Sequence, residues 1–189
     1  MSKEFIRGYI DRLKALLGKL SLERIEEITG EILAAYERDR SIFVMGNGGS
    51  GATASHFACD LNKGVSFGLK KRFRVTCLSD SLPIILACAN DFSYQDIFVE
   101  QLKNFLKPGD VVIGISGSGN SKNVLKAFKY ANSQKAVTIG ISGFDGGKLA
   151  VLSKISLVVN SKDMQQVEDA HLIIAHIIMQ YLCQKLHRK

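Results

Sequence analysis

The sequence predicts an α/β protein with a central parallel sheet and helices on both of its faces. Three observations support this prediction: short apolar segments alternate with helical ones, glycine-rich loops follow two of the apolar segments, and a helix opens directly after each of these loops. Strands that are apolar on both faces and separated by helices are typical of a parallel sheet covered on both sides. In such sheets, ligands gather at the carboxyl ends of the strands.

The composition is that of an ordinary globular protein. The chain of 189 residues is long enough for a proper core and shows no repeat or linker, so we expect a single domain over residues 1–189. No apolar run reaches the roughly 18 residues that span a membrane. The first five residues mix charges and lack the apolar core of a secretion signal. We therefore expect a cytoplasmic protein without a membrane partner.

The charge argues against a nucleic-acid partner. The net charge of +7 is moderate, and the densest basic cluster, at residues 70–74, has no aromatic side chains interleaved at the spacing of a nucleic-acid module. We interpret this cluster as solvated surface. A basic surface can still attract a phosphorylated substrate.

The elements are expected in a fixed order along the chain. Two amphipathic helices come first: apolar residues recur at helical spacing from Phe5 to Leu16, and Ser21 is a plausible N-cap for a second helix that ends near Glu37. Strands are expected over residues 41–45, 73–78, 111–116, 136–142 and 155–159. Helices are expected over residues 52–61, 82–89, 94–106, 123–131 and 163–186. The leading helices, within residues 1–40, and the final helix offer more apolar surface than one small sheet can cover, so we expect residues 1–40 to serve in oligomerisation.

The most informative segment is the loop at residues 46–51, Gly-Asn-Gly-Gly-Ser-Gly, between a strand and a helix. Such a loop can present backbone N–H groups to an anion, and the helix N-terminus adds a positive partial charge. On the helix that follows, His56 and Asp60 share one face because they are four residues apart. The segment thus joins an anion cradle to a candidate acid, base or metal site. The loop also fits the G-x-G-x-x-G pattern, and Asp80 follows the next strand, so a nucleotide is an alternative ligand.

A second loop, at residues 116–121, repeats this arrangement. Its sequence, Ser-Gly-Ser-Gly-Asn-Ser, follows an apolar strand and opens a helix. Three hydroxyls at a helix N-terminus suit a phosphate monoester. A serine-rich cap without a ligand is the alternative, but the repetition of the strand–loop–helix pattern favours phosphate binding.

Two further segments carry polar groups with open roles. In the final helix, Glu168 and His176 are eight residues apart, which is roughly 80° around the helix axis, so they can point into one site. His171 lies roughly 140° from His176 by the same geometry and is not expected to join them. A histidine in an apolar helix is more often a core residue, so a structural role stays open. Asn90 and Asp91 end an apolar helix, either as a plain C-cap or as ligands for sugar hydroxyls.

Taken together, these segments resemble a sugar isomerase (SIS) domain, and within that family the phosphoheptose isomerase group. The resemblance rests on five ordered blocks and covers nearly the whole chain; the blocks are residues 46–50 with 56–58, residues 90–92 with 96–98, residues 115–121, residues 143–147, and residues 168–176. It implies a flavodoxin-like sandwich and a homotetramer with active sites between subunits. It also implies conversion of sedoheptulose 7-phosphate to D-glycero-D-manno-heptose 7-phosphate, a precursor of lipopolysaccharide heptose.

The resemblance also implies roles for individual residues. Proton transfer falls to Asp60 and His176. Zinc ligands are implied at His56, Asp60, Glu168 and His176. Contacts to the phosphorylated sugar are implied at Asn47, Gly48, Gly49, Asn90, Asp91, Ser116, Gly117, Ser118, Ser121 and Glu168.

The chain departs from the family pattern at four positions. Asp60 stands where the family usually has Glu, which withdraws the carboxylate by about one methylene, and general-base catalysis is sensitive to reach. Glu168 replaces a Gln, Gly117 a Thr and Gln165 an Asp. These changes motivate an alternative, a non-catalytic phosphosugar-binding or protein-binding SIS module of the kind that binds a replication initiator. The imidazole of His176 favours the enzyme, because a binding module has no need of it.

Overall fold

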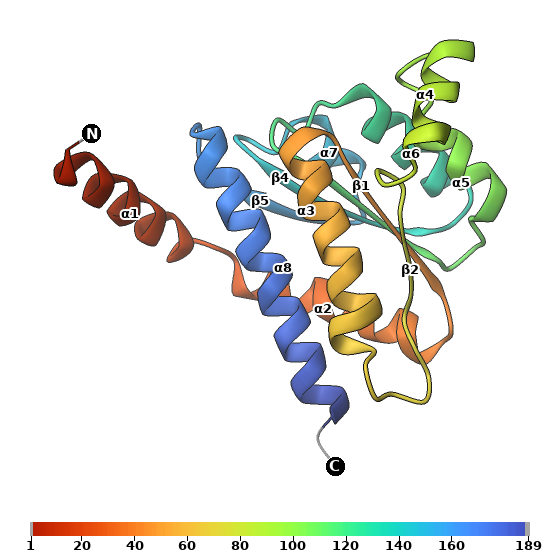
Figure 1. Ribbon diagram of the computed structural model, residues 1–189, viewed down its shortest axis with the longest axis horizontal. Helices are drawn as coiled ribbons and strands as arrows, with labels where there is room; N and C mark the ends of the chain where they lie inside the picture. Colours follow the sequence, from red (N-terminus) through yellow and green to blue (C-terminus); the bar gives the residue numbers. More distant parts are fainter. Residues whose placement is uncertain (1, 188–189) are drawn as a thin grey trace.

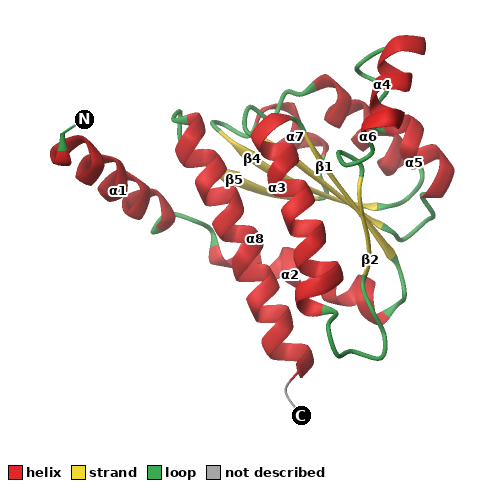
Figure 2. Cartoon of the chain, viewed as in Figure 1, coloured by secondary structure: helices red, strands yellow, loops and turns green. Residues whose placement is uncertain are grey.

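The computed structural model describes residues 2–187, which form helices on both faces of a five-stranded sheet (Figures 1 and 2). Along the chain the elements are α1 (Lys3–Leu17), α2 (Leu22–Glu37), β1 (Ser41–Gly46), α3 (Gly48–Cys59), the π-helical segment η1 (Asp60–Val65), β2 (Arg74–Cys77), α4 (Leu82–Asp91), α5 (Val99–Phe105), β3 (Val111–Ser116), α6 (Lys122–Ser133), β4 (Val137–Gly143), α7 (Gly147–Leu152), β5 (Ile155–Val159) and α8 (Met164–His187).

The strands are all parallel, in the order β2-β1-β3-β4-β5, which confirms the predicted parallel sheet. Val44 of β1 is aligned with Ile113 of β3, and Ile113 with Ile139 of β4. The chain runs in opposite directions along the sheet on either side of the β1–β3 pair. The loops that follow β1 and β3 therefore diverge and leave a crevice, which is where parallel α/β proteins bind ligands.

One hydrophobic core lies on each face of the sheet, because alternate residues of each strand point to opposite faces. Ile113 belongs to the core beneath α2, α3 and α8, whereas its neighbour Val112 belongs to the core beneath α5, α6 and α7. All six residues of β3 are buried, as expected for a central strand. On the first face, α3 and α8 pack side by side (Figure 1). This contact brings two distant parts of the sequence together.

Helix α1 stands away from the sheet and is tied to α8 (Figure 1). The Tyr9 hydroxyl donates a hydrogen bond to Asp169 Oδ2 at 2.6 Å. This bond raises the pKa of Tyr9 to about 12, because it stabilises the protonated phenol. The apolar side chains of Phe5, Ile6 and Ile10 stay exposed.

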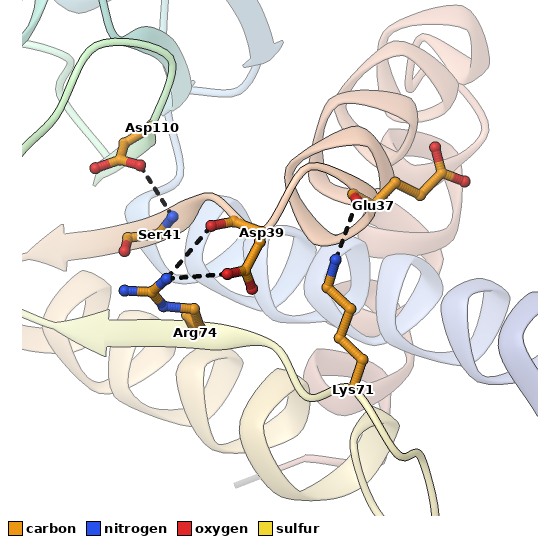
Figure 3. A network of polar contacts seen from close by, with 6 residues as sticks. All are labelled: Glu37, Asp39, Ser41, Lys71, Arg74 and Asp110. Carbon is orange, nitrogen blue, oxygen red and sulfur yellow. Dashed lines mark hydrogen bonds and ion pairs between the residues drawn. The ribbon is translucent and has the colours of Figure 1, made fainter.

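At the amino ends of the strands, a polar network fixes the start of the sheet (Figure 3). Asp110 accepts hydrogen bonds from the backbone N–H of Ser41 at 3.0 Å and from that of Lys107 at 2.9 Å. Arg74, at the start of β2, pairs with Asp39 at 3.4 Å. The Arg74–Asp39 pair is exposed and therefore contributes little to stability. This end of the sheet is opposite the carboxyl ends of the strands.

The observed elements differ from the expected ones mainly at their ends. α3 begins at Gly48, earlier than residue 52, because glycines 48 and 49 are themselves the first helical residues. α5 is shorter than expected and begins at Val99, since residues 94–98 form turns. The short helix α7 was not predicted, because two glycines precede its apolar residues and read as a loop.

Candidate active site

The two glycine-containing loops lie at the carboxyl ends of β1 and β3, on adjacent strands. Close backbone packing explains two of their glycines. A Cβ at Gly46 would lie 2.5 Å from the carbonyl oxygen of Ser50, and a Cβ at Gly119 would collide with the carbonyl oxygen of Gly146. Gly119 also has a φ of +64°, a conformation that L-residues rarely adopt. These glycines allow each loop to fold tightly onto the helix start or the neighbouring loop.

The first loop leaves the N-terminus of α3 open. Asn47 is the N-cap residue, with an extended backbone, but its side chain makes no capping hydrogen bond. The hydrogen bonds found within residues 2–187 do not use the N–H groups of Gly48, Gly49 or Ser50. Unused N–H groups at a helix N-terminus attract anions, because they donate hydrogen bonds and carry the positive end of the helix dipole.

The second loop forms a small pocket of about 150 Å³ beside this helix end. Ser116, Ser118 and Ser121 line it together with Asn47 and Ser50 from the first loop. The hydroxyl oxygens of Ser116 and Ser121 are 3.0 Å apart. The pocket, which we call the serine pocket, therefore combines hydroxyls from one loop with residues at the helix start of the other.

Three of the predicted metal-binding residues converge between α3 and α8. His56 Nε2 and His176 Nε2 are 2.9 Å apart, and Asp60 Oδ2 lies 3.4 Å from the first and 3.9 Å from the second. Asp60 Oδ2 is buried and has no hydrogen-bond partner among the described residues. It stands at the start of η1, and π-helical turns are frequent at functional sites.

The geometry of this cluster fits a metal ion. A point equidistant from the three atoms lies about 2.0 Å from each, which is the circumradius of a triangle with sides of 2.9, 3.4 and 3.9 Å. Zinc binds imidazole nitrogen and carboxylate oxygen at about 2.0–2.2 Å. Two imidazole nitrogens and one carboxylate oxygen, which is buried and has no hydrogen-bond partner, thus form a three-atom donor set suited to this ion.

Glu168, the fourth predicted metal-binding residue, lies elsewhere in the described chain. Its carboxylate sits against the start of α3, where a Cβ at Gly49 would be 2.5 Å from both oxygens, and it lines the serine pocket. Eight residues of helix separate it from His176 by about 12 Å along the axis. The angular argument placed both side chains on one side of α8, two turns apart, and in the structure this separation leaves Glu168 outside the cluster of His56, Asp60 and His176.

The remaining predicted residues separate into two groups. Gly117 lines the serine pocket, where a Cβ would collide with the sulfur of Met164. Asn90 and Asp91 are exposed at the end of α4, which projects from the body, and they bond to each other at 2.9 Å (Figure 1). The structure of one chain does not bring this pair to the serine pocket.

Three further residues are a buried histidine of α8, His171, and two partners of Asn47 that the sequence patterns did not indicate, Asn123 and Tyr94. His171 is 1% exposed, and burial lowers its pKa to about 4. It does not belong to the cluster around His176, as expected. Asn123 and Tyr94 both hydrogen-bond the side chain of Asn47. An asparagine directly after the second loop was the only local signal for Asn123, and it resembles an ordinary residue of a first helical turn.

Comparison with known proteins agrees with this combination of fold and site. The family model described as SIS domain matches residues 5–143. Its fold and its site therefore define the chain as a SIS-domain protein. The features concerned are the parallel sheet, the two loops and the cluster.

Curated relatives and solved structures narrow the class. The chain is 36% identical over 178 residues to a phosphoheptose isomerase of Helicobacter pylori, covering 94% of this chain and 91% of the relative. It is 37% identical over 158 residues to that of Clostridium acetobutylicum, covering 83% and 80%. The structure of phosphoheptose isomerase GmhA from Neisseria gonorrhoeae matches with a TM-score of 0.88 at 27% identity, over 96% and 98% of the two chains. The chain belongs to the phosphoheptose isomerase family.

Within residues 2–187, none of the helices combines the length and the apolar character that crossing a bilayer requires.

Proposed function

We propose that this protein is an isomerase that interconverts sedoheptulose 7-phosphate and D-glycero-D-manno-heptose 7-phosphate. The observation that carries the proposal is the convergence of His56, Asp60 and His176 on α3 and α8, two helices that also reach a pocket suited to a phosphate at their N-terminal ends. The direct test is incubation of the purified protein with sedoheptulose 7-phosphate. We expect an aldoheptose phosphate to appear, with deuterium from D₂O incorporated at the carbon next to the carbonyl. A protein that binds the sugar phosphate but neither converts it nor exchanges this hydrogen is a binding module instead.

The reaction moves a proton between adjacent carbons through an enediol, and therefore needs a base for the carbon-bound proton and an acid on the neighbouring oxygen. Asp60 and His176 are the pair that we assign to these steps. Asp60 is nearly buried, which keeps water away from the carboxylate, whereas the His176 side chain is 42% exposed and can reach a substrate. Asp60 Oδ2 and His176 Nε2, 3.9 Å apart, can exchange protons with a bound sugar only while neither atom holds a metal ion.

The serine pocket provides orientation. The hydroxyls of Ser116, Ser118 and Ser121 donate to phosphate oxygens, and the N–H groups of Gly49 and Ser50 supply further donors beside them. Fixing the phosphate holds the reacting carbons at a set distance from Asp60 and His176, which contributes much of the rate enhancement. Glu168 places a carboxylate in this pocket. Its negative charge repels the phosphate, so phosphate binding is weaker than it would be with the neutral amide of glutamine.

We propose His56, Asp60 and His176 as the residues that hold zinc. When bound, the ion supplies a Lewis acid that polarises the sugar carbonyl. The imidazole of His56 would then act as a ligand, and its ring meets that of His176 edge to face, with the ring centroids 5.1 Å apart.

Substitution of the cluster residues tests this assignment. We expect the protein, loaded with zinc and freed of excess metal, to hold about one equivalent per chain by elemental analysis, and His56→Ala to lose it, because removal of one of three ligands leaves too few. Glu168→Gln is the matched control on the serine pocket, and we expect it to retain the metal. Equal metal loss in both variants would show that Glu168 is also a ligand, for instance from another subunit.

We also propose that the protein is a homotetramer with active sites between subunits. The exposed apolar side chains of α1 and of the α2–α8 groove, which include Phe5, Ile10, Leu22 and Tyr181, support assembly. Asn90 and Asp91 project from the body of the chain. Assembly would allow them to contribute to the active site of a neighbouring subunit. Sedimentation velocity at micromolar concentration is expected to give four times the chain mass, and a monomer would contradict the proposal.

A further inference from the structure

Asn123 is a buried residue at the start of α6 whose amide pairs with that of Asn47. Asn123 Nδ2 donates to Asn47 Oδ1 at 2.8 Å, and Asn47 Nδ2 donates to Asn123 Oδ1 at 2.9 Å. Asn123 is 2% exposed, so its polar groups need partners inside the protein. The pair connects the loop after β1 with the helix after β3, across the crevice between the two strands.

The backbone fixes the direction of this pair. Asn123 Oδ1 also accepts a hydrogen bond from the backbone N–H of Val124 at 2.9 Å. A backbone N–H can only donate, so the oxygen of Asn123 faces Val124, and its NH₂ group must face Asn47 Oδ1. The Tyr94 hydroxyl approaches the same oxygen at 2.9 Å. Both acceptor positions of Asn47 Oδ1 are therefore in use.

This occupation explains why Asn47 does not cap its own helix. Asparagine is among the best N-cap residues, because its side-chain oxygen accepts from the N–H of the second or third helical residue. Asn47 has the right backbone for a cap, with φ −113° and ψ 151°, yet makes no such bond. The residues that it would cap are Gly49 and Ser50, whose N–H groups stay open beside the serine pocket.

We propose that Asn123 is a positioning residue that holds the Asn47 side chain away from the N-terminus of α3 and so keeps the Gly49 and Ser50 N–H groups free for the substrate. Tyr94 supports it by filling the second acceptor position. The inference rests on the proposed function, because it is the bound sugar phosphate that uses these N–H groups.

Asn123→Asp is the decisive variant. The aspartate still accepts from Val124 and from Asn47 Nδ2, but it has no N–H to donate to Asn47 Oδ1. The aspartate oxygen that takes the place of Nδ2 repels Asn47 Oδ1, so this oxygen turns away from residue 123 and toward the N-terminus of α3. We expect KM for sedoheptulose 7-phosphate to rise about tenfold or more, with a smaller change in kcat, because hydrogen bonds to a charged ligand are lost. Asn132→Asp is the matched control on the same helix: Asn132 Nδ2 donates to the carbonyl of Leu152 at 2.8 Å, far from the loops. It is expected to alter stability without changing KM.

A second substitution separates positioning from a purely structural role. Asn47→Gly added to Asn123→Asp removes the side chain that closes the helix end, and glycine is itself an acceptable N-cap. In ¹H–¹⁵N spectra of the ligand-free protein, we expect the Gly49 and Ser50 amide signals of the double variant to return toward their wild-type positions. KM is not the readout for this variant, because Asn47 itself lines the serine pocket. A double variant whose Gly49 and Ser50 amide signals stay where they are in Asn123→Asp alone, or an unchanged KM in Asn123→Asp, overturns the proposal.

A readout without substrate keeps this test independent of the proposed function. In ¹H–¹⁵N spectra of the ligand-free protein, Asn123→Asp should shift the Gly49 and Ser50 amide signals downfield, as new hydrogen bonds to Asn47 form, and Tyr94→Phe should do so to a smaller degree. Unmoved amide signals contradict the positioning role, whatever the enzyme's activity. A wild-type protein that fails to convert the sugar phosphate, but shows these shifts, contradicts only the proposed function.

Discussion

Asp60→Asn and His176→Ala are each expected to lower kcat for sedoheptulose 7-phosphate by about 10²- to 10⁴-fold, the usual contribution of a general acid or base. Asparagine has nearly the shape of aspartate but cannot take up a proton, so Asp60→Asn removes the chemistry and leaves the packing beside η1 in place. His176 is partly exposed, so its truncation leaves no buried cavity. Initial rates give kcat, and circular dichroism with thermal melts shows whether each variant is folded.

A third histidine of α8 provides the control for this pair. His187 bonds the backbone carbonyl of Val65 at 2.8 Å, at the far end of the helix, and His187→Ala should leave kcat unchanged. If Asp60 and His176 act in one proton transfer, the double variant should lose little more than the worse single variant, because residues that act as a unit are not additive. Undiminished rates in both single variants would remove these residues from the mechanism.

Gly119→Ala is expected to lower the free energy of unfolding by about 3 kcal/mol or more, which is the range of severe steric and backbone defects. The added Cβ collides with the backbone of Gly146, which cannot rotate away as a side chain can, and the φ of +64° is itself strained for alanine. The same displacement disturbs the serine pocket, so substrate binding should weaken as well. Urea denaturation at fixed protein concentration measures the stability change, and KM measures the change at the pocket.

Gly30→Ala is the matched control for this substitution. Gly30 lies on α2 in the α2–α8 groove, and within the single chain a Cβ there has nothing within 4 Å, so the two proteins are compared in the same oligomeric state. Alanine should therefore raise the free energy of unfolding by about 0.5–1 kcal/mol, because it forms helix more readily than glycine. A Gly119→Ala protein as stable as the wild type would mean that the loop at residues 116–121 does not pack against the backbone of Gly146 as described.

Most of the fold could be predicted from local patterns. β3 and β5 begin and end at the residues that the apolar runs indicated, and the final helix differs from its expected range by one residue at each end. Such patterns predict secondary structure because a strand buried on both faces is apolar at consecutive residues, whereas a helix buried on one side is apolar at helical spacing. α7 escaped prediction because its six residues are too few to show a helical period.

The sequence by itself determined the parallel α/β fold, the two glycine-containing loops at helix N-termini and the i,i+4 placement of His56 and Asp60, since each depends on residues that are close along the chain. Only the tertiary structure decided that His176, 120 residues from His56, completes this cluster, that Glu168 lies at the serine pocket, and that Asn47 pairs with Asn123. The reason is that these meetings depend on how α3, α6 and α8 pack on the sheet. Helix packing depends on the shapes of two buried surfaces together. The local pattern of one helix therefore does not show which other helix it contacts or at what height along its axis.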